Sequence, residues 1–205
     1  MKDNKAVLYI IAGANGSGKS TLAEELLQEK QLEFLNADDI AKEIAPDAIN
    51  SVPISAGKLY FKRLKYFFQL NKSFAVESTL SGNNIVRIIK EARLKHYKII
   101  LIYSFLQSCT TCIERVKKRV ENGGHDVPEA DIIRRYYKSI LKFWDEYRLM
   151  ADEWTLFYNG YEYAPVAVSY GQSDKFDIIN EEIQEKFNNI YQIAKDGLKW
   201  LIEMY

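Results

Sequence analysis

Glycines, a lysine and hydroxyl residues stand close together near the start of the chain, directly after an apolar run from Ala6 to Ala12, with the spacing G-x-x-x-x-G-K-[ST]. A buried strand that ends in glycines and opens a helix leaves backbone N–H groups unpaired at the positive end of that helix, so the turn can hold a polyphosphate. In such a loop the lysine reaches the β- and γ-phosphates and the first hydroxyl residue holds Mg²⁺. The predicted cofactors are therefore Mg²⁺ and ATP or GTP. The predicted nucleotide-binding residues are Gly13, Ala14, Asn15, Gly16, Ser17, Gly18, Lys19, Ser20 and Thr21, with Ser20 as the metal ligand.

Acidic side chains follow two further strand-like runs, Phe34 to Asn36 and Phe74 to Glu77. The ends of parallel strands lie together at one edge of a sheet, so Asp38 and Glu77 should face the γ-phosphate. A carboxylate there can accept the proton of an attacking hydroxyl or help to hold the metal. The alternative is that the segment Asn36 to Asp38 forms a helix N-cap, and Asp39 is the stronger candidate for a residue that only caps.

Arg115 and Arg119 are four residues apart and so share one face of a predicted helix. Two cations on a helix that ends in a glycine turn could form a lid over phosphates, spanning about residues 113–130; a solvated charged face explains the spacing equally well. We expect the inward side of this helix to be formed by Ile113, Val116 and Val120. The next helix is expected to start at Pro128, Glu129 and Asp131.

Both cysteines lie in one C-x-x-C pair, Cys109 and Cys112, at a predicted strand-to-helix junction. A pair at a helix start could be redox-active, because the helix end lowers the pKa of a thiol. Zinc would need two further ligands, and the only histidines are His96 and His125. Two ordinary thiols are the interpretation that we favour over a redox or metal site.

Strand-like and helical patterns alternate along the whole chain, which predicts an α/β fold with a mostly parallel sheet covered by helices on both faces. Ligands bind such sheets at the carboxyl ends of the strands. No repeat, low-complexity tract or linker interrupts the pattern, so residues 1–205 are predicted to form a single P-loop kinase-type domain with a last helix at about 177–205. The expected strands cover residues 6–12, 34–36, 74–77, 98–106, 154–158 and 166–170.

Composition limits the classes of partner. The chain has 205 residues, of which 47% are hydrophobic, and its 28 basic and 28 acidic side chains cancel, so no nucleic acid is expected. The longest apolar stretch, Ile99 to Tyr103, is far shorter than the about 20 residues that span a bilayer, so no membrane association is expected. A cleavable signal would remove the nucleotide loop, which predicts a cytoplasmic location.

With these residues in place, the chain resembles the zeta toxin family of P-loop kinases, in its smaller bacterial subgroup. The resemblance runs from Val7 to about Gly160. It is carried by the nucleotide loop, by N-A-D-D-I at 36–40, by V-E-S-T-L-S-G at 76–82, and by R-V-x-x-R-V-x-x-G-G-H-x-V-P at 115–128 with R-R-Y at 134–136. It implies a phosphotransferase with an alcohol group as acceptor, which uses ATP and Mg²⁺ to phosphorylate the sugar of UDP-N-acetylglucosamine and is held inactive by an antitoxin protein.

The resemblance also implies roles for single residues. Lys19 and Ser20 contact ATP and Mg²⁺, Asp38 is the base for the sugar hydroxyl, and Arg115 acts on the transferred phosphate. The family has a second phosphate-clamping arginine near the position of His125, so either His125 or Arg119 would have to replace it. An acidic residue and a serine that the subgroup carries around residues 158–160 are absent here, which leaves the acceptor open. The residues placed at the acceptor are Asn36, Glu77, Thr79, Arg119 and His125.

Two other classes fit parts of the pattern. The Leu80 to Gly82 segment is similar to the signature of transporter-type ATPases, but in that class the signature precedes the strand with the acidic end, whereas here Glu77 comes first. A regulatory nucleotide-binding module or an ATPase without acceptor phosphorylation would keep Lys19 and Ser20 but would need neither Asp38 nor the lid.

Overall fold

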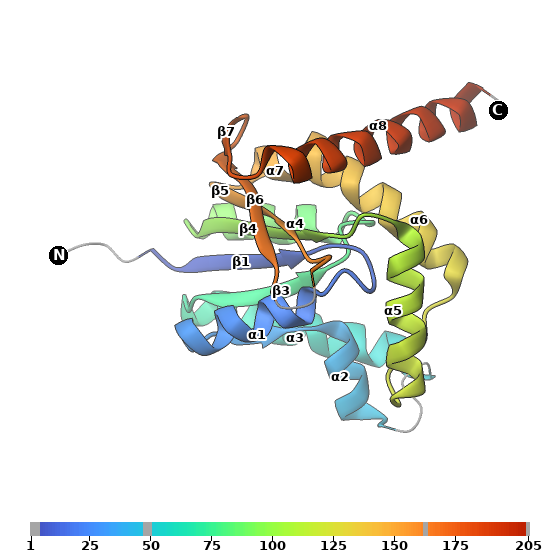
Figure 1. Cartoon of the computed structure of the whole chain (residues 1–205). Helices are drawn as coiled ribbons and strands as arrows, with labels where there is room; N and C mark the ends of the chain where they lie inside the picture. Colours follow the sequence, from blue (N-terminus) through green and yellow to red (C-terminus); the bar gives the residue numbers. More distant parts are fainter. Residues whose placement is uncertain (1–4, 47–50, 162–163, 204–205) are drawn as a thin grey trace.

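The computed structural model describes residues 5–46, 51–161 and 164–203, and these residues build one seven-stranded sheet with helices on both faces (Figure 1). The strands are β1 (Val7–Ala12), β2 (Glu33–Leu35), β3 (Phe74–Ser78), β4 (Lys98–Phe105), β5 (Glu153–Tyr158), β6 (Val166–Gln172) and β7 (Lys175–Ile178). The helices are α1 (Lys19–Lys30), α2 (Ala37–Ile44), α3 (Pro53–Leu70), α4 (Asn84–Leu94), α5 (Cys109–Glu121), α6 (Glu129–Lys142), α7 (Arg148–Met150) and α8 (Glu181–Glu203), and a π-helical turn, η2 (Phe143–Tyr147), continues α6.

The order of the strands places the nucleotide loop at the centre of the sheet. The order is β2-β3-β1-β4-β5-β6-β7, and the first five of these strands are parallel. Ala12, the last residue of β1, pairs with Ser78 of β3 on one side and with Tyr103 of β4 on the other. The predicted α/β fold with a mostly parallel sheet is therefore confirmed, and the carboxyl ends of β3, β1 and β4 meet at one edge.

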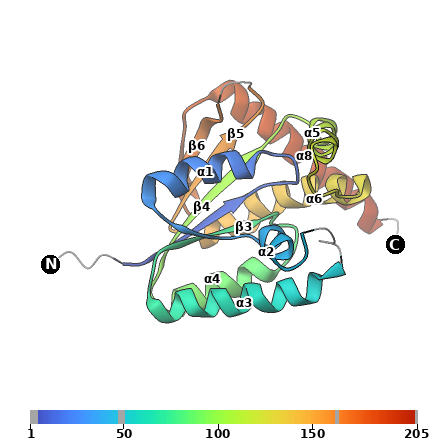
Figure 2. The same cartoon turned by 90° about the horizontal axis from the view of Figure 1, so that it is seen from below.

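The two faces of the sheet are covered unequally. Among the described residues, α1 is the helix that packs on one face, where Tyr9, Ile11, Ala23 and Ala75 form a small core. Helices α3, α4, α6 and α8 cover the other face over a much larger apolar core (Figure 2). Because both faces of β1 are buried, its sequence is a continuous apolar run rather than an alternating one.

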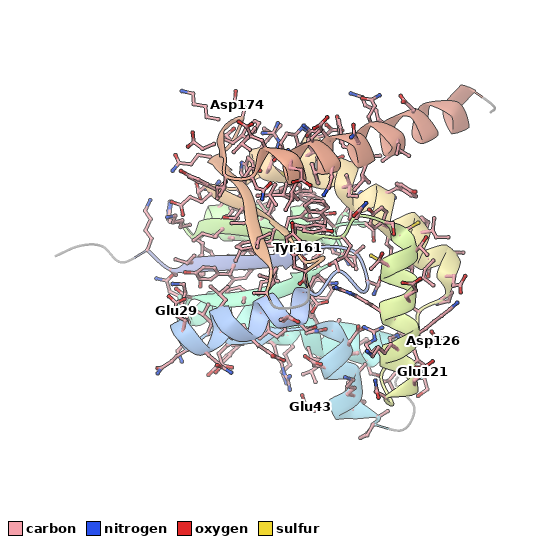
Figure 3. The ribbon with its side chains drawn as sticks, in the orientation of Figure 1. Glu29, Glu43, Glu121, Asp126, Tyr161 and Asp174 are labelled. Carbon is pink, nitrogen blue, oxygen red and sulfur yellow. The ribbon has the colours of Figure 1, made fainter. Side chains whose placement is uncertain are left out.

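Aromatic side chains fill the larger core. The Tyr103 ring stacks on that of Phe143 at 4.3 Å between centroids, and Phe143 meets Trp154 and Phe187 edge to face. These contacts fix η2 and α8 against β4 and β5. Many charged side chains lie outside, as the outward-pointing Glu29, Glu43, Glu121 and Asp174 illustrate (Figure 3). No helix among the described residues is both long enough and apolar enough to cross a membrane.

The last fifth of the chain differs from the sequence expectation. Strand β6 runs on to Gln172 and pairs antiparallel with β5, and a further antiparallel strand, β7, follows it. Helix α8 begins at Glu181 rather than near 177, because residues 177 and 178 belong to β7 and the Asn180 side chain accepts a hydrogen bond from the N–H of Ile183. All four residues of β7 are exposed, so no buried face imposes an apolar pattern on its sequence.

Candidate active site

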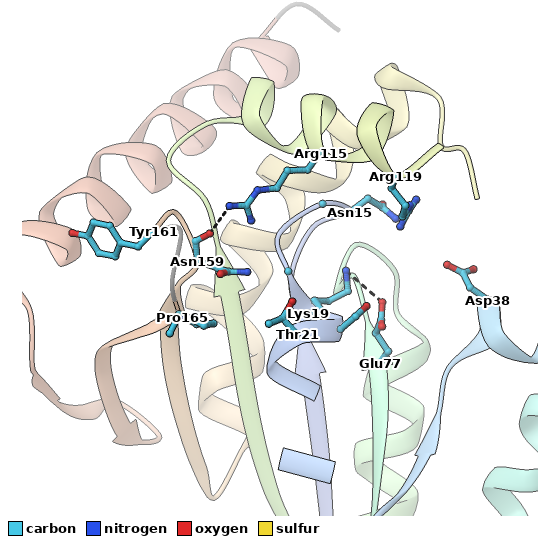
Figure 4. A pocket seen from close by; sticks show the side chains of 14 residues that line it. Asn15, Lys19, Thr21, Asp38, Glu77, Arg115, Arg119, Asn159, Tyr161 and Pro165 are labelled. Carbon is cyan, nitrogen blue, oxygen red and sulfur yellow. Dashed lines mark hydrogen bonds and ion pairs between the residues drawn. The ribbon is translucent and has the colours of Figure 1, made fainter. Parts of the chain in front are cut away.

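A polar cavity of about 390 Å³ lies over the carboxyl end of β1, where the fold predicts a ligand site (Figure 4). It combines residues from the nucleotide loop, from α2, β3 and α5, and from the segment after β5. The residues that line it are Asn15, Gly16, Gly18, Lys19, Ser20, Thr21, Asp38, Glu77, Arg115, Arg119, Asn159, Tyr161, Ala164 and Pro165.

The loop between β1 and α1 adopts a backbone that requires glycine at particular positions. Gly16 and Gly18 have φ values of 81° and 86°, in the left-handed region. A Cβ atom at Gly18 would lie 1.5 Å from Nδ2 of Asn159, and one at Gly16 would lie 2.4 Å from the carbonyl oxygen of Cys112. No side chain caps the N-terminus of α1, so its first N–H groups are available to an anion.

Lys19 points into the cavity and is only 6% exposed. Its Nζ donates a hydrogen bond to the carbonyl oxygen of Ala14 at 2.9 Å and lies 3.4 Å from Oε1 of Glu77. The other carboxylate oxygen of Glu77 accepts a hydrogen bond from Nδ2 of Asn36 at 3.0 Å. A buried ammonium needs such partners, and phosphate oxygens bound by the loop would offer it others.

Asp38 lies in the first turn of α2, and its side chain faces the cavity from the side opposite Arg115 (Figure 4). The residue that caps α2 is Asn36, whose Oδ1 accepts a hydrogen bond from the N–H of Asp38 at 2.8 Å. The N-cap expected within the segment Asn36 to Asp38 is therefore formed by Asn36, and the expectation that Asp38 or Asp39 caps the helix is wrong. The shorter β2 strand explains the difference, because it ends at Leu35 and leaves Asn36 as the boundary residue.

The two predicted lid arginines both reach the cavity from α5, but each has a partner within the chain. Nη2 of Arg115 donates to the carbonyl oxygen of Asn159 at 2.9 Å, and Nη2 of Arg119 donates to the carbonyl oxygen of His125 at 2.6 Å. His125 thus contributes its backbone here, and its imidazole is not part of the cavity wall. Val120 is 36% exposed rather than packed inward, since the last turn of α5 extends past the core.

Two of the residues predicted at the acceptor lie beside the cavity rather than in its wall. Asn36 reaches it through its hydrogen bond to Glu77. The hydroxyl of Thr79 lies 2.8 Å from that of Ser81, at a neighbouring cavity between the loop after β3 and helix α6.

Sequence reasoning missed the residues that follow β5. Asn159 donates its backbone N–H to Phe105 and its side-chain Nδ2 to the carbonyl oxygen of Ser17, so it ties β4 to the nucleotide loop. Its position at the carboxyl end of a parallel strand was the available signal. A second omission is Arg135, whose Nη1 donates to Oδ1 of Asn15 in the loop at 3.1 Å.

The C-x-x-C pair has the character of two ordinary thiols. Both cysteines are free, and burial raises the pKa of the Cys112 thiol to about 12, which opposes formation of the reactive thiolate. Cys109 lies at the start of α5 with its Sγ 3.9 Å from the Tyr137 hydroxyl. Within the ranges that the structure describes, His, Cys, Asp and Glu side chains form no group of three or more suited to a metal ion.

Comparison with known proteins gives one family and several relatives. The model of the AAA domain family AAA_33 matches residues 8–136. An uncharacterised protein of Haemophilus influenzae is 34% identical over 134 residues, which cover 65% of this chain and 93% of that protein. A shikimate kinase of Staphylococcus haemolyticus is 28% identical over 125 residues, which cover 60% of this chain and 68% of the kinase.

Solved structures share the fold at low sequence identity. A chain of the AvrRxo1-ORF1:-ORF2 crystal structure with ATP superposes with a TM-score of 0.72 at 16% identity, over 89% of this chain and 63% of that one. The present chain therefore spans less than two thirds of the length of that neighbour. The PezAT toxin-antitoxin system of Streptococcus pneumoniae gives a TM-score of 0.63 at 15% identity, over 99% of this chain and 90% of that one.

Proposed function

The chain belongs to the AAA domain family, and from that premise we propose that it is a P-loop kinase that transfers the γ-phosphoryl group of ATP or GTP to a hydroxyl of a small molecule. One observation carries the proposal: Lys19, Asp38, Glu77 and Arg115 come from four separate elements and converge on a single cavity. Nucleotide binding alone would require only the loop and its lysine. A carboxylate and an arginine placed across that loop are the further parts that phosphoryl transfer needs.

The nucleotide loop is the donor half of this site. Backbone N–H groups of residues 14–20 and the Lys19 ammonium hold the phosphates. The cavity also suits Mg²⁺, because Ser20, Asp38 and Glu77 surround it with hydroxyl and carboxylate oxygens, the ligands that this ion prefers. Bound there, Mg²⁺ would neutralise charge on the phosphates.

The two carboxylates have different roles in this proposal. Glu77 is engaged by Lys19 and Asn36, so it positions the lysine and shapes the cavity. Asp38 is exposed on the cavity wall, where it can accept the proton of an attacking hydroxyl. Arg115 leaves its backbone partner to neutralise the charge that develops on the transferred group.

The second phosphate clamp is Arg119 rather than His125. The Arg119 side chain lines the cavity, whereas the His125 carbonyl holds that side chain in place. Exchange of the carbonyl for phosphate oxygens would pair the guanidinium with charged acceptors, to which arginine can make two parallel hydrogen bonds.

The acceptor that we propose is a nucleotide sugar such as UDP-N-acetylglucosamine, on the basis of the resemblance to zeta toxins. Likeness to the PezAT system and to AvrRxo1-ORF1, which was crystallised with ORF2, also supports a protein partner of the antitoxin type. The proposed acceptor and the proposed partner both go beyond the kinase proposal, and either can be wrong while the kinase proposal is right.

A metabolite screen tests the proposal. The protein is incubated with ATP, Mg²⁺ and a metabolite extract, and mass spectrometry identifies any compound that gains a phosphoryl group. The parent and Asp39→Asn should form the same new phosphomonoester at similar rates, and Asp38→Asn should form it far more slowly. Asp39 is a matched control because it lies in the same exposed helical turn but does not line the cavity. Formation of ADP and inorganic phosphate alone would favour an ATPase or a regulatory module.

A further inference from the structure

A second polar cavity, of about 360 Å³, lies between the loop that follows β3 and helix α6. Two contacts join it to the nucleotide loop. Nη1 of Arg135 donates to Oδ1 of Asn15 at 3.1 Å, and the N–H of Gly13 donates to the carbonyl oxygen of Ser78 at 3.2 Å. The cavity therefore lies next to the place where the proposed γ-phosphate binds.

The loop that forms one wall is held in an unusual backbone conformation. Leu80 has a φ of 52°, in the region that disfavours residues other than glycine, and its side chain is 1% exposed in the core. Its N–H donates to Oγ of Ser78 at 3.0 Å. This turn sets the hydroxyls of Thr79 and Ser81 side by side on the cavity wall, 2.8 Å apart.

The same loop is fixed from the side of α6 and η2. The Tyr147 hydroxyl donates to the carbonyl oxygen of Gly82 at 2.7 Å, and Nζ of Lys142 donates to Oδ1 of Asn83 at 2.7 Å. The wall with the hydroxyls is thus held at a set distance from the helix that carries the arginines. Such prior ordering reduces the entropy that a ligand loses on binding.

The opposite wall carries a net positive charge. Arg134 and Arg135 share one carboxylate, with Nη2 of Arg134 2.7 Å from Oδ1 of Asp131 and Nη2 of Arg135 3.3 Å from Oδ2. Two guanidinium groups against one carboxylate leave one positive charge in excess. Each guanidinium has five N–H donors, so donors remain for a ligand.

We propose that this cavity binds an anionic group of the acceptor, a phosphate or a carboxylate, through Arg134, Arg135 and the hydroxyls of Thr79 and Ser81. The inference rests on the proposed function, because it makes the cavity the acceptor half of the same site. The planar fork of arginine matches the oxygens of both anions, and hydroxyls add neutral donors. The acceptor is then a polyol that carries a phosphate or carboxylate, and a neutral sugar is a poor substrate.

Binding of simple anions tests the cavity without any turnover. The protein is saturated with Mg²⁺ and a non-hydrolysable ATP analogue, so that the nucleotide loop is filled. It is then titrated with inorganic phosphate or, separately, with malonate, while NMR follows the Nε–H resonances of its arginines. We expect saturable shifts of the Arg134 and Arg135 resonances, and the anion that binds more tightly identifies the class of group.

Variants distinguish anion binding in the cavity from a general effect of removing a positive charge. Arg134→Gln should lower the affinity for the anion by about tenfold or more, the size of effect expected when a hydrogen bond between charged groups is lost. Arg93→Gln is the matched control, since Arg93 is 44% exposed against 54% for Arg134, pairs with one carboxylate and lies in the last turn of α4. Absence of a saturable shift with both anions, or equal affinity in Arg134→Gln, would overturn the inference.

A comparison of acceptors distinguishes this inference from the kinase proposal. Turnover of UDP-N-acetylglucosamine and of neutral N-acetylglucosamine is measured with the parent protein. Anion binding at the arginines without phosphoryl transfer to any acceptor would contradict the kinase proposal alone. Transfer to the neutral sugar with the same kcat/KM as to its charged counterpart would contradict the anion cavity alone.

Discussion

Some residues of the main cavity already have partners within the chain, and others are free to contact a substrate. Lys19 and Glu77 hold one another, and the arginines Arg115 and Arg119 rest on backbone carbonyls. Asp38 instead presents an exposed carboxylate to the cavity. Substitutions at these positions should therefore affect different steps of the proposed reaction.

Lys19→Ala should weaken binding of Mg²⁺-ATP by at least about tenfold, because a buried ammonium that contacts phosphates makes charge-assisted hydrogen bonds. Calorimetric titration measures the affinity. Lys30→Ala, an exposed lysine in the last turn of the same helix, is the control and should bind as the parent does. Equal binding by Lys19→Ala would place the nucleotide elsewhere.

Asp38→Asn should leave the affinity for ATP nearly unchanged and lower kcat by about 10²-fold or more, the usual contribution of a general base. The amide keeps the size of the side chain but cannot accept the proton of the hydroxyl. Steady-state and binding measurements on the same preparation separate the two effects. An unchanged kcat would leave Asp38 as a polar residue of the cavity wall only.

Arg115→Ala should depress kcat by about 10³-fold with a smaller change in KM, because a cation that stabilises the transferring phosphoryl group acts mainly in the transition state. Arg119→Ala, one helical turn further along α5, should have the smaller effect. Rates with saturating ATP and acceptor provide the comparison. Normal turnover in Arg115→Ala would contradict the proposed lid role of α5 and favour the alternative of a solvated charged helix.

At the level of elements, the segment after β5 holds the nucleotide loop through the side-chain hydrogen bond of Asn159. Gly18→Ala should abolish nucleotide binding, because the new Cβ would meet the Asn159 side chain and the φ of 86° is strained for alanine. Gly57→Ala, at a helical glycine with open space around it, should be neutral or stabilising. Thermal unfolding with and without Mg²⁺-ATP distinguishes lost binding from lost folding. A normal ligand-induced rise in Tm for Gly18→Ala would show that the loop rearranges around the new methyl group.

The elements nearest the nucleotide loop were the most predictable from the sequence. Strand β1, its loop and α1 combine an apolar run, glycines and a helical pattern, so three local signals agree. Strand β7 lacked such agreement, because its exposed residues carry no pattern imposed by a core. The cap of α2 could not be assigned to one residue from the sequence, because Asn36, Asp38 and Asp39 all suit an N-cap and only the end of β2 decides among them.

The residues of the candidate site also differ in how well the sequence predicts them. Lys19 and Ser20 follow from local spacing, and Asp38 and Glu77 follow from the rule that strand ends meet at one edge. Asn159 and Arg135 come from distant segments and meet the loop only through tertiary packing. Asn159 directly follows β5, so the same rule could have identified it, whereas no strand end precedes Arg135 and only the folded chain places it.

For the molecule as a whole, the sheet provides one edge at which donor and acceptor groups meet. The order β2-β3-β1-β4-β5 brings Asp38, Glu77, the nucleotide loop and Asn159 to that edge. Helix α5, which carries both lid arginines, runs beside the same edge (Figure 1). A nucleotide-binding module would not need this convergence. We therefore expect the chain to transfer the γ-phosphoryl group of the nucleotide to an acceptor hydroxyl.

A reaction with ATP that is labelled with ¹⁸O on its γ-phosphate measures this transfer. The labelled nucleotide, Mg²⁺ and an acceptor found in the metabolite screen are incubated with the protein, and the phosphomonoester is analysed by mass spectrometry. In-line transfer to a hydroxyl predicts a product that carries the labelled non-bridging oxygens of the γ-phosphoryl group and an unlabelled ester oxygen from the acceptor. Labelled inorganic phosphate as the sole phosphorus product beside ADP, with no labelled ester, would contradict the account.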